Sequence, residues 1–245
     1  MDYRTYKLSL RERIIYSMQY MGIFLVLGKI FYDSFFAALA GVFFLPLLLK
    51  RKASILAAKR REVLTLEFKD FILAFSASLK AGYSAENALV AAGRDLASMY
   101  EESSLMVEEC RKMEKNLKNN QLSEVLLAEF AGRSGQEEIR DFAAIFVIAK
   151  RSGGAMGAII KNTADIISEK IEVKREIQLL YAAKRMEQNI MNIVPVAMIG
   201  YVRMTTPDYF DVLYHNLFGI LVMSLCLVVY AGAYMLSRKI MDIEV

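Results

Sequence analysis

Acidic side chains gather at two places in the middle of the chain, where they could exchange a proton or bind a basic partner surface. They are Glu101, Glu102, Glu108 and Glu109 in one stretch and Glu137, Glu138 and Asp141 in another. Acid catalysis by paired carboxylates needs a shared buried site, and no acid pair lies within the apolar parts of the sequence. Acids near the start of a helix are favoured by the helix dipole, so a solvated surface is the default interpretation. Docking of a partner protein is the alternative that we retain.

The other reactive side chains form no recognisable catalytic constellation. His215 is the single histidine, which leaves too few residues for a histidine metal site or a serine triad. The glycine-rich run at residues 152–157 lacks the Gly-Lys-Ser/Thr ending of a phosphate-binding loop. Cys110 lies in charged sequence and Cys226 in apolar sequence, so no disulfide is expected between them. The sequence therefore predicts a protein that is not an enzyme and that binds neither metal nor cofactor.

Three apolar blocks surround this charged middle, at residues 14–49, 190–201 and 217–236. A single helix over the first block would be about 54 Å long, well beyond a hydrocarbon core of ~30 Å. We therefore expect a hairpin with helices at 14–31 and 35–49, turning near Lys29, Asp33 and Ser34. The second helix is short for a full crossing, and a re-entrant hairpin is the competing interpretation.

Basic residues flank the apolar blocks and set the expected orientation. Lysine and arginine cluster before residue 14, after residue 49, before residue 190 and after residue 236. The positive-inside rule then predicts four crossings of the cytoplasmic membrane, with both termini in the cytoplasm. The expected organisation is an N-terminal segment and hairpin at 1–49, a cytoplasmic domain at 50–188, and a membrane pair with a tail at 189–245. The net charge of +4 indicates contact with lipid headgroups rather than nucleic acid.

The charged middle predicts a compact bundle of six helices, so the fold class is all-α with four membrane helices flanking this bundle. Apolar residues recur at helical spacing over 54–80, 84–95, 96–118, 123–130 and 139–149, and from about 155 towards the next apolar block. Gly82 is expected to end the first helix with a positive φ, and Ser84 to cap the second. Gly153 and Gly154 are expected to form the turn before the sixth helix.

Three segments resemble the type II secretion system F domain family. Residues 71–89 (FILAFSASLKAGYSAENAL) resemble its Ala-Gly turn motif, and residues 146–159 (FVIAKRSGGAMGAI) resemble its later double-glycine turn. Residues 206–209 (TPDY) resemble the loop before its last membrane helix, in which Pro207 is a turn residue. The ending at residues 238–245 resembles the TadB group, whose members serve Tad/Flp pilus machines.

The resemblance implies a platform protein in the cytoplasmic membrane, part of a Tad/Flp-type pilus or a type II secretion machine. Such a protein contacts a hexameric cytoplasmic ATPase, a sister platform protein and pilin subunits, and it works as a homo- or hetero-oligomer. The two acidic stretches then become candidate docking surfaces. The alternatives are the sister (TadC-like) platform protein of the same machine, a membrane enzyme, and a small-molecule transporter.

Overall fold

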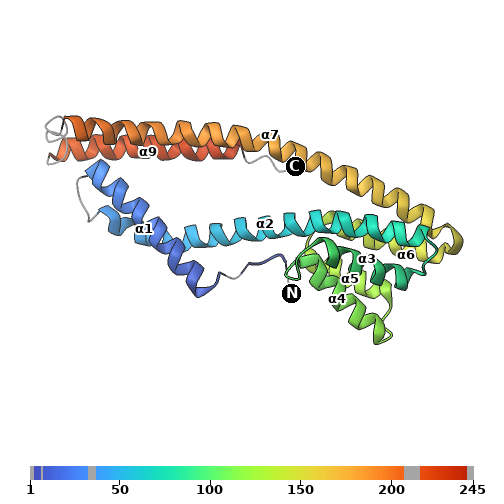
Figure 1. Ribbon diagram of the computed structural model, residues 1–245. Helices are drawn as coiled ribbons and strands as arrows, with labels where there is room; N and C mark the ends of the chain where they lie inside the picture. Colours follow the sequence, from blue (N-terminus) through green and yellow to red (C-terminus); the bar gives the residue numbers. More distant parts are fainter. Residues whose placement is uncertain (1–2, 7, 33–36, 207–215, 242–245) are drawn as a thin grey trace. The chain divides into compact units, whose positions relative to one another are not determined.

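The computed structural model describes residues 3–6, 8–32, 37–206 and 216–241, and every regular element in these ranges is helical (Figure 1). The all-α fold class predicted from the sequence is thereby confirmed. The elements are α1 (Leu10–Tyr32), α2 (Ala37–Lys80), α3 (Ala85–Met99), α4 (Leu105–Lys118), α5 (Ser123–Ser134), α6 (Glu137–Arg151), the 3-10 helix η1 (Gly153–Ala155), α7 (Met156–Thr205) and α9 (Leu217–Met241).

The chain divides into two compact units. The helical domain contains Met1–Lys7 and Lys52–Lys174, and the apolar unit contains Leu8–Arg51 and Arg175–Val245. The chain therefore passes between the units at residues 7–8, 51–52 and 174–175. The second and third passages lie inside α2 and α7, whereas the first lies in the segment before α1. The first residues of the chain thus belong to the helical domain and not to the membrane segment with which the sequence pattern groups them.

A single 44-residue helix, α2, replaces the two helices expected at 35–49 and 54–80. The basic cluster at Lys50, Arg51 and Lys52 does not end the helix, because lysine and arginine are good helix formers whose long side chains carry their charge away from apolar surroundings. Pro46 also lies inside α2. The helix that begins after the last glycine turn, α7, runs without a break for 50 residues and includes Pro195. The prediction that this helix continues into apolar sequence is confirmed.

Phenylalanine side chains at helical spacing build the core of the helical domain. Five of them are each at most 1% exposed: Phe68, Phe71 and Phe75 from α2, and Phe142 and Phe146 from α6. Phe68 meets Phe142 edge-on with ring centroids 5.5 Å apart, and Phe71 stacks on Phe75 at 6.2 Å. Such ring pairs add about 0.5–1.5 kcal/mol each beyond the area that they bury. The i, i+3, i+7 spacing in α2 therefore selects its buried face.

The break between the second and third helices of the domain lies later than the sequence pattern predicts. α3 extends to Met99 and α4 begins at Leu105, so the break falls at residues 100–104 rather than near residue 95. Ser104 is the N-cap residue of α4, and its hydroxyl oxygen accepts a hydrogen bond from Val107 N at 3.4 Å. A serine cap is a strong local start signal, and it determines where α4 begins.

The apolar unit contains two helices that are long and apolar enough to cross a membrane, at Leu10–Phe31 and Phe218–Ser237. Only 11% of each span is buried, so most of its residues are at least partly exposed. Four crossings were expected, and two candidate spans are found in the described residues. Of the residues expected to form the hairpin turn, Lys29 lies inside α1, which continues to Tyr32. Asp33 and Ser34 lie outside the described residues.

Helices α7 and α9 pack side by side within the apolar unit (Figure 1). The hydroxyl of Tyr230 in α9 donates to the carbonyl oxygen of Asn192 in α7 at 2.5 Å, and Gln188 Nε2 in α7 donates to Ser237 Oγ in α9. The order of these contacts along the two helices shows that they run antiparallel.

Candidate functional site

The first acidic stretch does not lie along one helix face. Glu101 and Glu102 precede α4 and are exposed, whereas Glu108 and Glu109 lie in its first turns. Glu102 Oε1 lies 3.0 Å from Arg111 Nη2. The side chain of Glu108 is 42% exposed and that of Glu109 is 0% exposed. These four carboxylates therefore do not form one surface patch, because the cap at the start of α4 separates the two pairs and the helix turns Glu109 inward.

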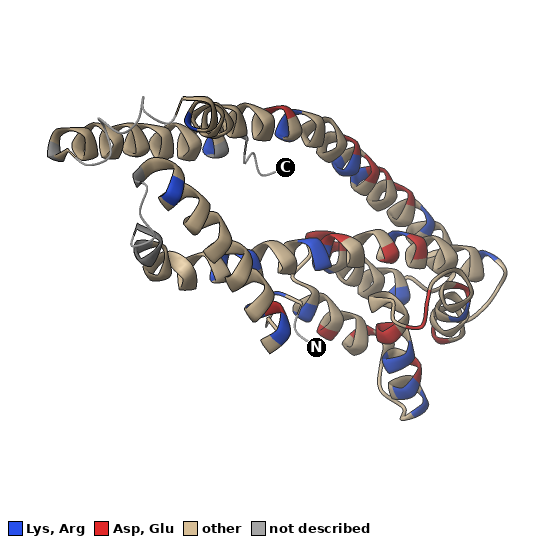
Figure 2. Ribbon diagram, turned by 60° about the vertical axis from the view of Figure 1, so that its left-hand side comes forward, with Lys and Arg blue, Asp and Glu red and all other residues tan. Residues whose placement is uncertain are grey.

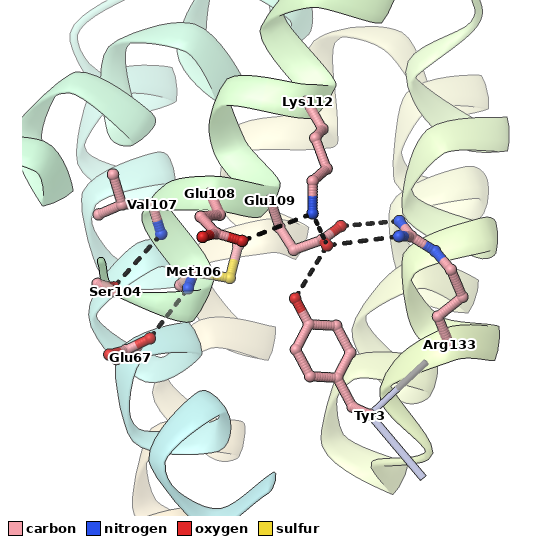
Figure 3. Close-up of polar contacts among 9 residues, drawn as sticks. All are labelled: Tyr3, Glu67, Ser104, Met106, Val107, Glu108, Glu109, Lys112 and Arg133. Atoms are coloured by element: carbon pink, nitrogen blue, oxygen red, sulfur yellow. Dashed lines mark hydrogen bonds and ion pairs between the residues drawn. The ribbon is translucent and has the colours of Figure 1, made fainter. Parts of the chain in front are cut away.

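Glu109 forms the centre of a buried polar network (Figure 3). Its Oε2 lies 2.7 Å from Arg133 Nη2 in α5, and its Oε1 lies 2.8 Å from Lys112 Nζ. The Tyr3 hydroxyl donates to the same Oε1 at 2.9 Å. Burial opposes ionisation of Glu109, but the bonds from Lys112, Tyr3 and Arg133 outweigh it and lower the pKa of this carboxyl. The carboxylate is ionised, and Arg133 and Lys112 of the same domain balance its charge, so it is not available to a partner.

The second acidic stretch is bound by lysines of α7. Glu138 is 4% exposed, and its Oε1 lies 2.9 Å from Lys174 Nζ. Burial opposes ionisation of Glu138, but the bond from Lys174 outweighs it and lowers the pKa of this carboxyl. Lys170 Nζ lies 3.3 Å from Glu137 and 4.0 Å from Asp141, whose side chains are 55% and 46% exposed. Glu138 therefore joins α6 to α7, while Glu137 and Asp141 remain at the surface.

Side chains of α2 fix the break before α4, where two of the exposed carboxylates lie. Glu67 Oε2 accepts a hydrogen bond from Met106 N at 2.9 Å, which satisfies one of the N–H groups that the first turn of α4 leaves open. The Tyr100 hydroxyl donates to Asp70, and this bond together with burial raises the pKa of Tyr100 to about 12. The loop therefore presents Glu101 and Glu102 from an anchored position.

A further polar junction, which the sequence analysis did not single out, joins α3, α5 and α6. Lys150 Nζ lies 2.7 Å from Glu86 Oε1, 3.0 Å from Glu124 Oε2 and 2.8 Å from Ser123 Oγ. Burial alone would lower the pKa of Lys150, but the bonds from the two carboxylates outweigh it and raise this pKa. Lys150 in turn lowers the pKa of Glu86. The sequence around these residues gives little indication of the junction. Glu86 and Glu124 lie in the first turns of their helices, where the helix dipole alone favours an acid.

The residues expected to form turns have the following positions. Gly82, after the end of α2, has a φ of +93°, and Gly153, after α6, has a φ of +60°. Ser84 is the N-cap residue of α3, although its side chain makes no cap hydrogen bond. Gly154 lies in η1. Pro207 lies outside the described residues.

The geometry offers surface carboxylates for ionic contact with a partner. Charged residues are concentrated in the helical domain and in the adjoining turns of α7, whereas long stretches of the apolar unit consist of other residues (Figure 2). Within the part of the chain that the structure describes, no group of three or more histidine, cysteine, aspartate or glutamate side chains could hold a metal ion. His215 lies outside that part.

Comparison with known proteins identifies a family for the chain. No curated protein and no solved structure matches it. The family model described as type II secretion system (T2SS), protein F, matches residues 71–203. This region begins in α2, ends in α7 and covers more than half of the 245 residues, including both acidic stretches and the Lys150 junction. The chain belongs to the T2SS protein F family, whose members are membrane components of secretion and pilus machines.

Proposed function

We propose that this protein is a platform in the cytoplasmic membrane of a Tad/Flp-type pilus or type II secretion machine, and that it couples a cytoplasmic ATPase to the assembly of pilin subunits. In this proposal it is not itself an enzyme. The observation that carries it is the reach of the family match, which extends along α7 from the helical domain into the apolar unit. A continuous helix of 50 residues is about 75 Å long and can carry displacement from one unit to the other.

The proposal includes four membrane crossings with both termini in the cytoplasm. Packing within the apolar unit supports it, because Phe31 of α1 and Met223 of α9 form a buried cluster against which Ile199 of α7 packs. Gly41 of α2 lies so close to the ring of Phe24 in α1 that a side chain at this position would overlap it. The apolar parts of α2 and α7 thus contact the two helices that are both long and apolar enough to cross, as expected if all four share the bilayer.

Cysteine labelling tests this topology. In a Cys226→Ala background, Thr206→Cys and Asn216→Cys should react with an impermeant reagent added to intact cells, because these positions flank the proposed outer loop. Glu102→Cys in the helical domain should react only after permeabilisation. Labelling of Asn216→Cys only after permeabilisation would contradict the proposed orientation.

The assignment to the TadB-like member of the platform pair rests on the sequence of the C-terminal residues 238–245, of which 242–245 lie outside the described residues. The TadC-like sister protein is the alternative within the same machine. The proposed partners are the hexameric ATPase, the sister platform protein and pilin, in a homo- or hetero-oligomeric assembly. Co-purification of the full chain with the other members, followed by identification of each subunit, distinguishes the two platform roles.

The ATPase is proposed to dock on the carboxylates that remain at the surface, which are Glu101, Glu102, Glu108, Glu137 and Asp141. The full chain should hydrolyse no nucleotide alone, yet bind the secretion ATPase of the same machine more tightly at low salt than at physiological salt, because exposed charges are screened. The double variant Glu101→Lys/Glu102→Lys should weaken binding. Glu129→Lys, which reverses the charge of an exposed acid on α5, is the control for the position of the change. Nucleotide turnover by the chain alone would favour a membrane enzyme. Parent-like binding by Glu101→Lys/Glu102→Lys would remove the loop before α4 from the docking surface, and parent-like binding by Glu137→Lys/Asp141→Lys as well would place docking elsewhere.

A further inference from the structure

The first residues of the chain enter the helical domain rather than extending into solvent. Tyr3 is 0% exposed, although it lies only seven residues before the start of α1. Its backbone N–H donates to the carbonyl oxygen of Arg133 at 3.1 Å, close to the end of α5. The segment is therefore held by main-chain as well as side-chain contacts, which an unattached terminus would lack.

The site that receives Tyr3 is built from three helices (Figure 3). Its hydroxyl donates to Glu109 of α4, which is also bound by Arg133 of α5 and by Lys112. The Arg60 guanidinium of α2 lies 5.3 Å from the centre of the Tyr3 ring, within the range of a cation–π contact. The site contacts the Tyr3 ring through the Arg60 guanidinium and the Tyr3 hydroxyl through the Glu109 carboxylate. It therefore fits tyrosine better than phenylalanine, which lacks the hydroxyl, or leucine, which lacks both groups.

The neighbouring residue Arg4 lies over the turn between α5 and α6. Gly135 in this turn has a φ of +67°, and a Cβ atom built there would lie 2.9 Å from Arg4 Cγ. A glycine at this position therefore serves both the left-handed backbone and the close passage of the N-terminal segment.

The chemistry keeps the tyrosine in its neutral, hydrogen-donating form. Burial and the negative charge of Glu109 both raise the pKa of the Tyr3 hydroxyl. Glu109 remains ionised, with its pKa lowered by its partners in spite of burial. A neutral donor facing a fixed carboxylate is a charge-assisted hydrogen bond, which is stronger than a bond between neutral groups.

We propose that the helical domain carries a binding site for the N-terminal tyrosine, and that residues 3–6 form a latch that closes α2, α4 and α5 around it. The latch adds a third connection between the units, because the chain leaves it directly into the apolar unit at Leu8. The other two connections are the continuous helices α2 and α7. This inference does not depend on the ATPase or on the filament.

The test uses the full chain in detergent micelles, with hydrogen exchange of the α4 and α5 amides as the readout. Tyr3→Ala should speed the exchange of these amides by on the order of 100-fold, as expected for truncation of a buried aromatic side chain. Tyr3→Phe should give an intermediate rate, because it keeps the ring and loses the bond to Glu109. Thr5→Ala, at an exposed position of the same segment, should exchange like the parent.

Addition of a peptide separates a binding site from ordinary core packing. A synthetic peptide of residues 1–9 should restore slow exchange to the Tyr3→Ala protein, and the same peptide with alanine at position 3 should not. Parent-like exchange in Tyr3→Ala, or a Tyr3→Ala protein that neither peptide restores, would overturn the proposal. Restoration by both peptides would overturn recognition of the tyrosine. If Tyr3→Ala does not fold, parent-like exchange in Tyr3→Phe would overturn the role of the hydroxyl.

Discussion

Glu108→Gln and Glu109→Gln form a matched pair of substitutions at neighbouring positions of α4. Each removes one negative charge and keeps the size of the side chain. The two side chains differ in exposure, at 42% for Glu108 and 0% for Glu109. A difference between the variants therefore reports burial and partners rather than helix propensity or net charge.

The expected loss of stability follows from the contacts. Removing one partner of a buried ion pair costs roughly 3–5 kcal/mol, because the remaining charge is left uncompensated. The partners Arg133 and Lys112 are 36% and 45% exposed, so they recover some water when Glu109 is neutralised. Glutamine can also still accept the hydrogen bond from Tyr3. We therefore expect about 2–3 kcal/mol for Glu109→Gln and under ~1 kcal/mol for Glu108→Gln.

Thermal unfolding of the helical domain in the detergent-solubilised full chain measures both variants. A loss of this size lowers Tm by about 6–12 °C for a domain of this length, against a few degrees at most for Glu108→Gln. Equal Tm values for the two variants would refute the structural role assigned to Glu109.

The pH dependence gives an independent check of the same reasoning. Because folding lowers the pKa of Glu109, its contribution is fully present above the ordinary glutamate pKa of ~4.3 and is lost as the pH falls through the folded value. The difference in stability between the parent and Glu109→Gln should therefore shrink on acidification. A difference that grows as the pH falls would contradict the assigned charge state.

Three further substitutions test other parts of the structure. Lys150→Met should cost about 1–2 kcal/mol in thermal unfolding, because it leaves two partly exposed carboxylates without their shared cation. Gly82→Val should cost about 1–2 kcal/mol, since β-branched residues tolerate positive φ poorly; an unchanged Tm would show a different turn geometry. Gly41→Leu should reduce the yield of monodisperse protein extracted from membranes, because its side chain would meet the ring of Phe24. Gly232→Leu, which meets open space, should not; equal yields would contradict the packing of α1 on α2.

Local pattern is sufficient where burial follows the helical period. The phenylalanines of α2 and α6 recur at three- and four-residue intervals, so their spacing alone predicts which face is buried. Turn chemistry is equally local at Gly82, where a glycine follows a long helix and adopts a φ of +93°. These parts of the fold depend on interactions within one or two turns of the chain.

Long-range contacts explain what the sequence pattern does not predict. Nothing near Tyr3 indicates that it packs against residues more than a hundred positions away, since the contact to Glu109 depends on how the helices assemble. The continuity of α2 escapes prediction for a different reason. Lys50, Arg51 and Lys52 suggest a helix end, although a basic cluster indicates a change of surroundings and not a change of backbone conformation.

The burial of one acid in each stretch follows from its position on the helix. Glu109 lies three residues after Met106 and four before Met113, both of which are at most 5% exposed, so it shares their inward face. Glu138 lies four residues before Phe142 on α6 and faces the core in the same way. An acid in register with an apolar face requires a cationic partner from a neighbouring helix, and in both cases that partner is present.

Only the carboxylates at the surface are available to the proposed ATPase contact. Glu109 and Glu138 are buried, Glu137 and Asp141 share Lys170, and Glu102 pairs with Arg111. Among the proposed docking acids, Glu101 is therefore the least neutralised within the described part of the chain. Glu101 lies in the loop before α4, two residues after Met99, whose side chain is 67% exposed. The end of α3 and the anchored loop after it together offer an exposed apolar side chain and carboxylates, which can hold a partner with few ionic contacts. The salt dependence of docking should therefore be shallow, and Met99→Ser should weaken binding at physiological salt at least as much as Glu101→Lys does.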